Sequence, residues 1–107
     1  MGAADDRHQD WFDAGLETLK RRMLDIRADV ARFANRSFDD YPNVAQIFVT
    51  VPGIDLPDCV LRSTEAEQLV LNAIRQDLPT ACSVSLSDDF DPHLDTSALE
   101  VSVSFTT

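Results

Sequence analysis

The 107-residue sequence has few glycines and few cysteines, and both shortages exclude kinds of site. Its three glycines form no phosphate-cradling loop, and no nucleophile elbow is present. Two cysteines, Cys59 and Cys82, are too few for a disulfide framework. We expect both thiols to be structural, with Cys82 on the buried face of a strand. The sequence therefore predicts a protein that is not an enzyme and holds no cofactor.

Long hydrophobic runs are also missing. No apolar segment approaches the roughly 20 residues that cross a bilayer, and the N-terminus lacks the basic and apolar regions of a secretory signal. We therefore expect a cytoplasmic protein with no membrane partner. The chain length is typical of one domain, and an apolar fraction of 44% is high enough for a buried core.

Basic side chains are scarce in the second part of the chain. Residues 1–39 contain seven Lys and Arg against eight Asp and Glu, whereas residues 40–107 contain two against eleven. The formal net charge is −10. Such a chain has no electrostatic footprint for phosphates, so direct nucleic-acid binding is not expected. It would instead attract a protein with a basic surface. A saline habitat or a GC-rich genome would produce the same bias.

Residues 7–36 are predicted to form one long amphipathic helix, preceded by a flexible tail at residues 1–6. Apolar residues recur there at alternating spacings of four and three, which is a heptad pattern; they are Phe12, Leu16, Leu19, Met23, Ile26, Val30 and Phe33. About 28 helical residues span about 42 Å, more than the roughly 27 Å of an eight-residue strand. Part of the seam would then stay open for a second copy of the chain. The predicted homodimer interface consists of Leu16, Leu19, Met23, Ile26 and Val30.

Residues 43–107 are predicted to form a ββαββ unit. Alternating apolar residues indicate strands near residues 44–51, 80–87 and 98–105, with a short strand at 59–62 and a helix capped by Ser63 or Thr64. The residues expected to face the core are Ala45, Ile47, Val49 and Val51, then Cys82, Val84 and Leu86, then Leu99, Val101, Val103 and Phe105. The predicted fold is an α+β two-layer sandwich of order αββαββ, with a mostly antiparallel four-stranded sheet and helices on one face.

Residues 88–97 are predicted to form a connection, longer than hairpin loops usually are. Asp89, Asp91 and His93 could bind a metal ion or act in acid–base catalysis. Their spacing completes neither a calcium nor a zinc site, so no metal ligand is assigned. Phe90, among the carboxylates, would either anchor a partner or fold back onto the sheet.

Three functions follow from these patterns. The first is a small acidic protein-interaction module, of which inhibitor, immunity and nucleic-acid-mimic proteins are special forms. Its partner would bind Asp88, Asp89, Phe90, Asp91 and Asp95. The second is an assembly subunit that oligomerises through the N-terminal helix. The third is a metal-dependent protein or enzyme that uses residues 88–95.

Overall fold

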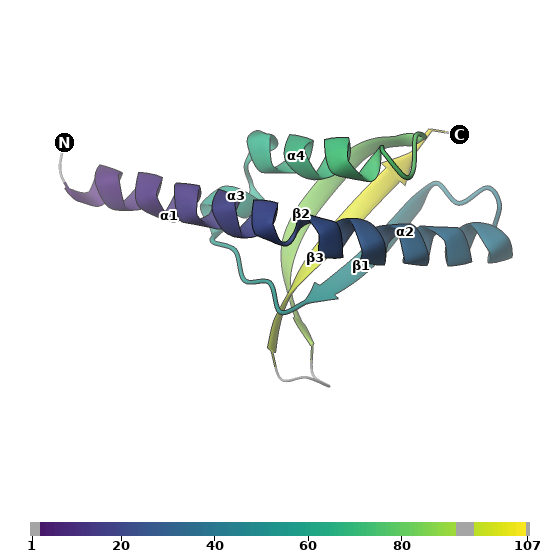
Figure 1. Cartoon of the computed structure of the whole chain (residues 1–107), viewed down its shortest axis with the longest axis horizontal. Coiled ribbons are helices and arrows are strands. Elements are labelled where there is room, and N and C mark those ends of the chain that lie inside the picture. The colour runs from purple at the N-terminus through teal and green to yellow at the C-terminus, as the bar shows by residue number, and fades with distance from the viewer. Residues whose placement is uncertain (1–2, 92–95, 107) are drawn as a thin grey trace.

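Four helices and three strands make up the described part of the chain. The computed structural model describes residues 3–91 and 96–106, with side chains for residues 10–89 and 96–106. The elements follow in the order shown in Figure 1: α1 (Ala3–Arg21), α2 (Met23–Asp40), β1 (Gln46–Pro52), α3 (Asp58–Leu61), α4 (Thr64–Ile74), β2 (Ala81–Asp91) and β3 (Thr96–Phe105). The α+β prediction is confirmed.

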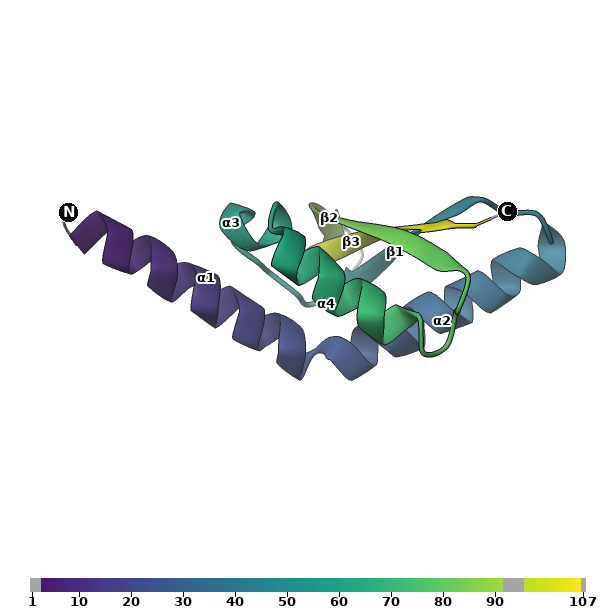
Figure 2. The ribbon, with the colours of Figure 1, turned by 90° about the horizontal axis from the view of Figure 1, so that it is seen from above.

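The three strands form one antiparallel sheet in the order β1-β3-β2. Residues opposite one another share a face, and most of the apolar ones face the helices; Val101 of β3, for example, lies opposite Val49 of β1 and Leu86 of β2. Helices α2 and α4 lie along the same side of this sheet (Figure 2). β1 and β2 are therefore the two edge strands.

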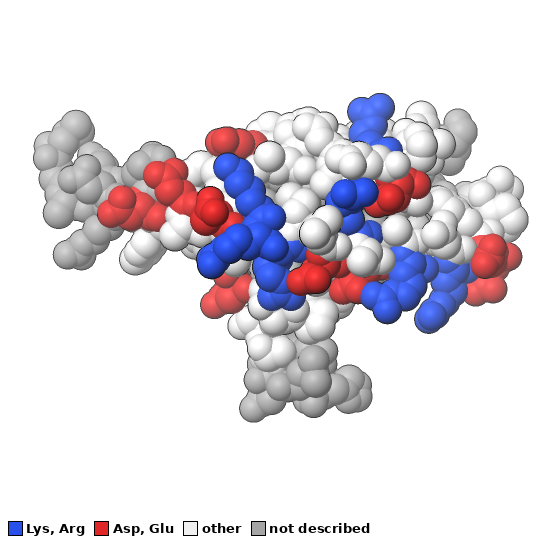
Figure 3. Space-filling model, in the orientation of Figure 1, with Lys and Arg blue, Asp and Glu red and all other residues white. Residues whose placement is uncertain are grey.

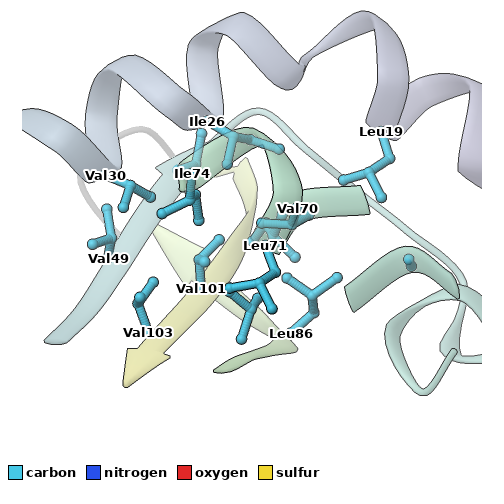
Figure 4. Packing of buried hydrophobic residues seen from close by; sticks show 14 of the residues in the cluster. Leu19, Ile26, Val30, Val49, Val70, Leu71, Ile74, Leu86, Val101 and Val103 are labelled. Atoms are coloured by element: carbon cyan, nitrogen blue, oxygen red, sulfur yellow. The ribbon is translucent and has the colours of Figure 1, made fainter. Parts of the chain in front are cut away.

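The core lies between that face of the sheet and the helices. Leu19, Ile26 and Val30 point into it from α1 and α2, and Val70 and Ile74 point into it from α4 (Figure 4). None of the residues whose side chains are described is both buried and polar. The core is held by apolar contacts alone, so the polar side chains of the strands lie on the opposite face or at the ends.

The single helix predicted over residues 7–36 is wrong, because two helices meet at Arg22 (Figure 2). The Arg22 guanidinium donates hydrogen bonds to the carbonyl oxygens of Gly53, at 2.9 Å, and Pro52, at 3.3 Å. One turn earlier, the Thr18 hydroxyl donates to the Ala14 carbonyl, a contact that often bends helices. The bend allows α1 to pack against α3 while α2 packs against β1.

The α1–α3 contact depends on a glycine. A Cβ atom at Gly15 would lie 2.5 Å from a methyl carbon of Val60 and 3.0 Å from Pro57 Cδ. Only a residue without a side chain permits this approach. Gly15 is therefore the contact point between α1 and α3.

The strand predicted at residues 59–62 is also wrong, because residues 58–61 form the one-turn helix α3. Two neighbouring residues, Val60 and Leu61, are both buried there. A strand with one buried face cannot bury neighbours, because successive side chains point to opposite faces. The described sheet therefore has three strands instead of four, and the order αββαββ does not hold. The helix predicted after it begins at Thr64, with the Ser63 hydroxyl accepting a hydrogen bond from the Ala66 amide at 3.3 Å.

Two side chains predicted to face the core do not. Cys82 is exposed, because it is the extra residue of a β-bulge: Ala81 lies opposite Phe105 and Ser83 opposite Ser104, so Ala81 is buried in its place. Ala45 is exposed and precedes β1. The other predicted inward residues of β1, β2 and β3 are buried as expected.

The connection predicted at residues 88–97 is shorter than expected. Strand β2 continues to Asp91 and β3 starts at Thr96, so that Asp88 lies opposite Leu99 and Asp91 opposite Thr96. The two strands form a hairpin arm that extends past the helices (Figure 1). Residues 92–95 lie outside the described part of the chain.

Candidate interaction surface

The outer face of the sheet is the face turned away from α2 and α4. No described helix lies over it (Figures 1 and 2). Its side chains alternate with the buried ones; they are Gln46, Phe48 and Thr50 of β1, Ser83, Ser85, Ser87 and Asp89 of β2, and Glu100, Ser102 and Ser104 of β3. Phe48 has 57% of its surface exposed. The outer face is therefore mostly polar, with one large aromatic side chain at the β1 edge.

Two hydrogen bonds hold side chains of the outer face in place. The Gln46 amide donates to the Ser102 hydroxyl at 2.8 Å, and the Thr50 hydroxyl donates to a carboxylate oxygen of Asp89 at 3.0 Å. The second bond joins the two edge strands across the outer face of β3, which lies between them. It also holds Asp89 on the outer face, where its charge is presented to the solvent side of the sheet.

The basic residues of the molecule are confined to the helices and their ends. All nine Lys and Arg residues lie in helices or directly after one; Figure 3 shows many of them gathered over α1 and α2. The three strands contain no basic residue, and their charged residues are Asp88, Asp89, Asp91 and Glu100. A ligand that approaches the outer face thus meets only negative charge from the strands.

A groove lies beside β1, where the strand edge faces α2. We call it the β1 groove; it has a volume of about 450 Å³. The residues that line it come from both elements; they are Asp29, Arg32, Phe33, Arg36, Phe48, Val49 and Thr50. Phe33 is 43% exposed there, on the helix side, and Asp29 accepts an ion-paired hydrogen bond from Arg32. Two exposed aromatic rings and three charged groups thus stand around one open strand edge.

The residues predicted to bind a partner are only partly described. Asp88 is exposed and Asp89 is half-buried, and they lie on opposite sides of the arm, since neighbouring residues of a strand alternate. The side chains of Phe90 and Asp91 lie outside the described part, and so does Asp95. The five residues stay a prediction, but of the two with described side chains, only Asp89 belongs to the outer face.

The predicted homodimer seam is used inside the chain itself. Leu16, Leu19, Ile26 and Val30 are each at most 7% exposed, and Met23 packs against the same core. They contact the chain's own strands and helices, so their side chains are not available to a second copy in this structure. The periodicity therefore identified a buried face, and the homodimer interface through it stays a prediction.

Metal ligands do not converge in the part of the chain that carries described side chains. No three His, Cys, Asp or Glu side chains there lie close enough to hold an ion. The alternative that uses Asp91 and His93 falls outside the described side chains and stays a prediction. Likewise, no described helix is long and apolar enough to cross a membrane.

Sequence reasoning did not assign Phe33 or Phe48 to a site. The heptad pattern of the predicted helix includes Phe33, and Phe48 lies within the strand predicted near residues 44–51. A usable signal existed for Phe48, because a large aromatic residue between Gln46 and Thr50 interrupts a polar face.

In comparisons with protein-family models, curated proteins and solved structures, no match was found.

Proposed function

We propose that this protein is a small acidic protein-interaction module, and that its outer sheet face binds a basic surface of a larger protein. The observation that carries the proposal is the charge of the open sheet face. No helix of the described residues covers it, and every charged residue in the strands is an acid. An antiparallel sheet can leave one face in water, but here that face also presents an exposed phenylalanine beside two carboxylates.

The chemistry of such a face suits a cationic partner. Asp89 and Glu100 provide charge, the serine hydroxyls provide donors and acceptors, and Phe48 provides an apolar contact. Charge complementarity raises the association rate and disfavours wrong partners, whereas a buried aromatic contact supplies affinity. Inhibitor, immunity and nucleic-acid-mimic proteins are specialised forms of this function.

Binding of a synthetic cationic strand tests the proposal. The probe is a fluorescent peptide of alternating Arg and Val, measured by anisotropy at low and high salt. We expect binding that weakens as salt is added, because exposed charges are screened beyond about 10 Å at 0.1 M ionic strength. The double variant Asp89→Asn, Glu100→Gln should weaken binding by about tenfold, equal to about 1.4 kcal/mol.

A matched control separates the outer face from the general field of the molecule. Asp39→Asn, Asp40→Asn removes the same charge from the exposed C-terminal turn of α2. We expect this control to change the affinity by less than about twofold. If both double variants weaken binding equally, the peptide responds to net charge and the outer face is not the binding surface.

A further inference from the structure

We infer that the β1 edge is a self-association site, at which two copies of the chain join their β1 strands antiparallel into one six-stranded sheet. This goes beyond the proposed function, because the ligand is a second copy of the chain and the contact is an edge rather than a face. Three features of the described residues carry the inference: the direction of the backbone groups, the charge pattern of the β1 groove and the lack of edge protection.

The backbone of β1 presents unpaired hydrogen-bonding groups to the open side. At its two ends, the Phe105 amide donates to the Ala45 carbonyl at 2.8 Å and the Gly53 amide donates to the Ser97 carbonyl at 2.9 Å. Residues 45 and 53 therefore turn toward β3. Because peptide groups alternate along a strand and the β1–β3 register is unbroken, residues 46, 48 and 50 turn away from β3. No described strand pairs with them.

These three residues are self-complementary. Two antiparallel copies can be related by a two-fold axis that passes between their Phe48 residues. Phe48 then lies opposite Phe48 of the second copy, and Gln46 lies opposite Thr50 of the second copy. Each facing pair then exchanges both N–H···O=C bonds. The two Phe48 rings meet on the outer face as an aromatic cross-strand pair, a kind of pair that stabilises antiparallel strands. Pro52, which has no N–H, ends the pairing.

The charges of the β1 groove are self-complementary as well. Asp29 and Arg36 both line it, seven residues apart and so about two turns apart on one side of α2. The same two-fold axis makes the two α2 helices antiparallel. Asp29 of each copy then lies near Arg36 of the other copy, so the contact occurs twice. Phe33, half-way between them, approaches its own copy below the joined strands. A patch with both charges suits contact with itself, as isologous interfaces require.

Edge protection is missing from β1. Monomeric sheets commonly guard an edge with charges, proline or a bulge. The outward residues Gln46, Phe48 and Thr50 are uncharged, the register has no bulge, and the proline comes last. The joined sheet keeps both outer faces on the same side, because the two-fold axis is perpendicular to it. The dimer therefore presents two copies of the acidic face side by side.

Sedimentation velocity over a range of concentrations tests the inference. We expect the mass to rise from 11.9 kDa toward twice that value at tens of micromolar. Phe48→Lys should weaken the dimer by at least about tenfold, since it adds a charge at the axis. Ser85→Lys is the matched control, which adds the same charge to the same face of the other edge strand; it should change dimerisation by less than about twofold.

A charge reversal tests the arrangement itself. Arg36→Asp alone should weaken the dimer, because it places two carboxylates together across the axis. The double variant Asp29→Arg, Arg36→Asp should restore the dimer, because it exchanges the two charges. Arg32 loses its ion pair with Asp29 but gains an aspartate four residues later, at position 36. Circular dichroism confirms that each variant is folded, and slowing of the Phe48 amide's hydrogen exchange with concentration locates the contact.

Three outcomes would overturn the inference: a monomer at every concentration, equal weakening by the Lys variants, or no restoration by the double reversal. None of them affects the proposed function, because the Arg–Val peptide assay can be run on the folded Arg36→Asp monomer, in which Phe48, Asp89 and Glu100 are unchanged. Loss of peptide binding to that monomer would count against the outer face alone.

Discussion

The two edge strands of the sheet, β1 and β2, differ in how they meet solvent. β2 has a bulge at Cys82 and carries Asp88, Asp89 and Asp91 toward its end. β1 has a regular register, no charged residue and an exposed phenylalanine in its middle. Bulges and charges are the devices that prevent further strand pairing.

This difference shows that the fold itself does not require an unprotected edge strand. Both edge strands pair with the same central strand β3, but only β2 carries a bulge and charged residues. Phe48 contributes little to the core, since its ring lies on the face away from the helices. The exposed side chain of Phe48 and the unprotected edge are the two features on which the proposed β1–β1 contact rests.

The largest effect is expected from separating the two faces of β1. Ile47→Ala removes a side chain that is 3% exposed and should lower the free energy of unfolding by about 2–5 kcal/mol. The neighbouring Phe48→Ala should lower it by about 1 kcal/mol or less, because that ring is mostly in solvent. Urea unfolding at low protein concentration, where monomers dominate, measures both. Equal losses would show that Phe48 belongs to the core.

A smaller effect is expected from the bond that links the two edges. Thr50→Val keeps the shape of the side chain and removes the hydroxyl that donates to Asp89. We expect a loss of about 0.5–1 kcal/mol, the usual net value of one hydrogen bond in a partly exposed setting. A double-mutant cycle with Asp89→Ala isolates the pair, and a coupling energy near zero would mean that the bond does not stabilise the sheet.

The smallest effect on stability is expected from deleting Cys82. Because Ala81 and Ser83 already lie opposite the neighbouring residues Phe105 and Ser104, removing the residue between them leaves a regular ladder. The free energy of unfolding should change by less than about 0.5 kcal/mol. Cys82→Ser, which keeps the bulge, is the control. Cross-strand nuclear Overhauser effects would show the regular pairing, and a loss of several kcal/mol would show that the chain needs the bulge.

The elements that sequence predicted well are those with one clear environment on each side. β3 alternates Leu99, Val101, Val103 and Phe105 with polar residues, and all four are buried. α4 has a cap at Ser63 and one apolar face. A period of two or of 3.6 residues reports burial directly, so these assignments needed no knowledge of the neighbours.

The elements that sequence missed are decided by contacts between distant segments. The bend at Arg22 is accompanied by bonds to carbonyls 30 and 31 residues away. The helical turn at residues 58–61 packs beside Gly15. Short apolar runs such as "CVLR" fit a strand or a helix equally, and only their neighbours decide between them.

The β1 groove could not be read from the sequence for the same reason. Phe33 and Arg36 of α2 lie beside Phe48 only because α2 runs along the edge strand. In the sequence, Phe33 continues a heptad seam whose earlier members are buried or pack against the core. Phe33 is 43% exposed although its neighbour Ala34 is buried and Phe38 packs on Phe105, so its exposure follows from its place on the helix beside the β1 edge.

Local patterns alone determined most of the residues that are buried in the strands, and that the strands carry no positive charge. Both follow from side-chain chemistry and the repeat of the backbone. Tertiary structure decided which helix covers the seam of α1 and α2, and which strand edge stays open. Those outcomes depend on long-range packing, because a strand is an edge strand only when no other strand pairs with one of its sides.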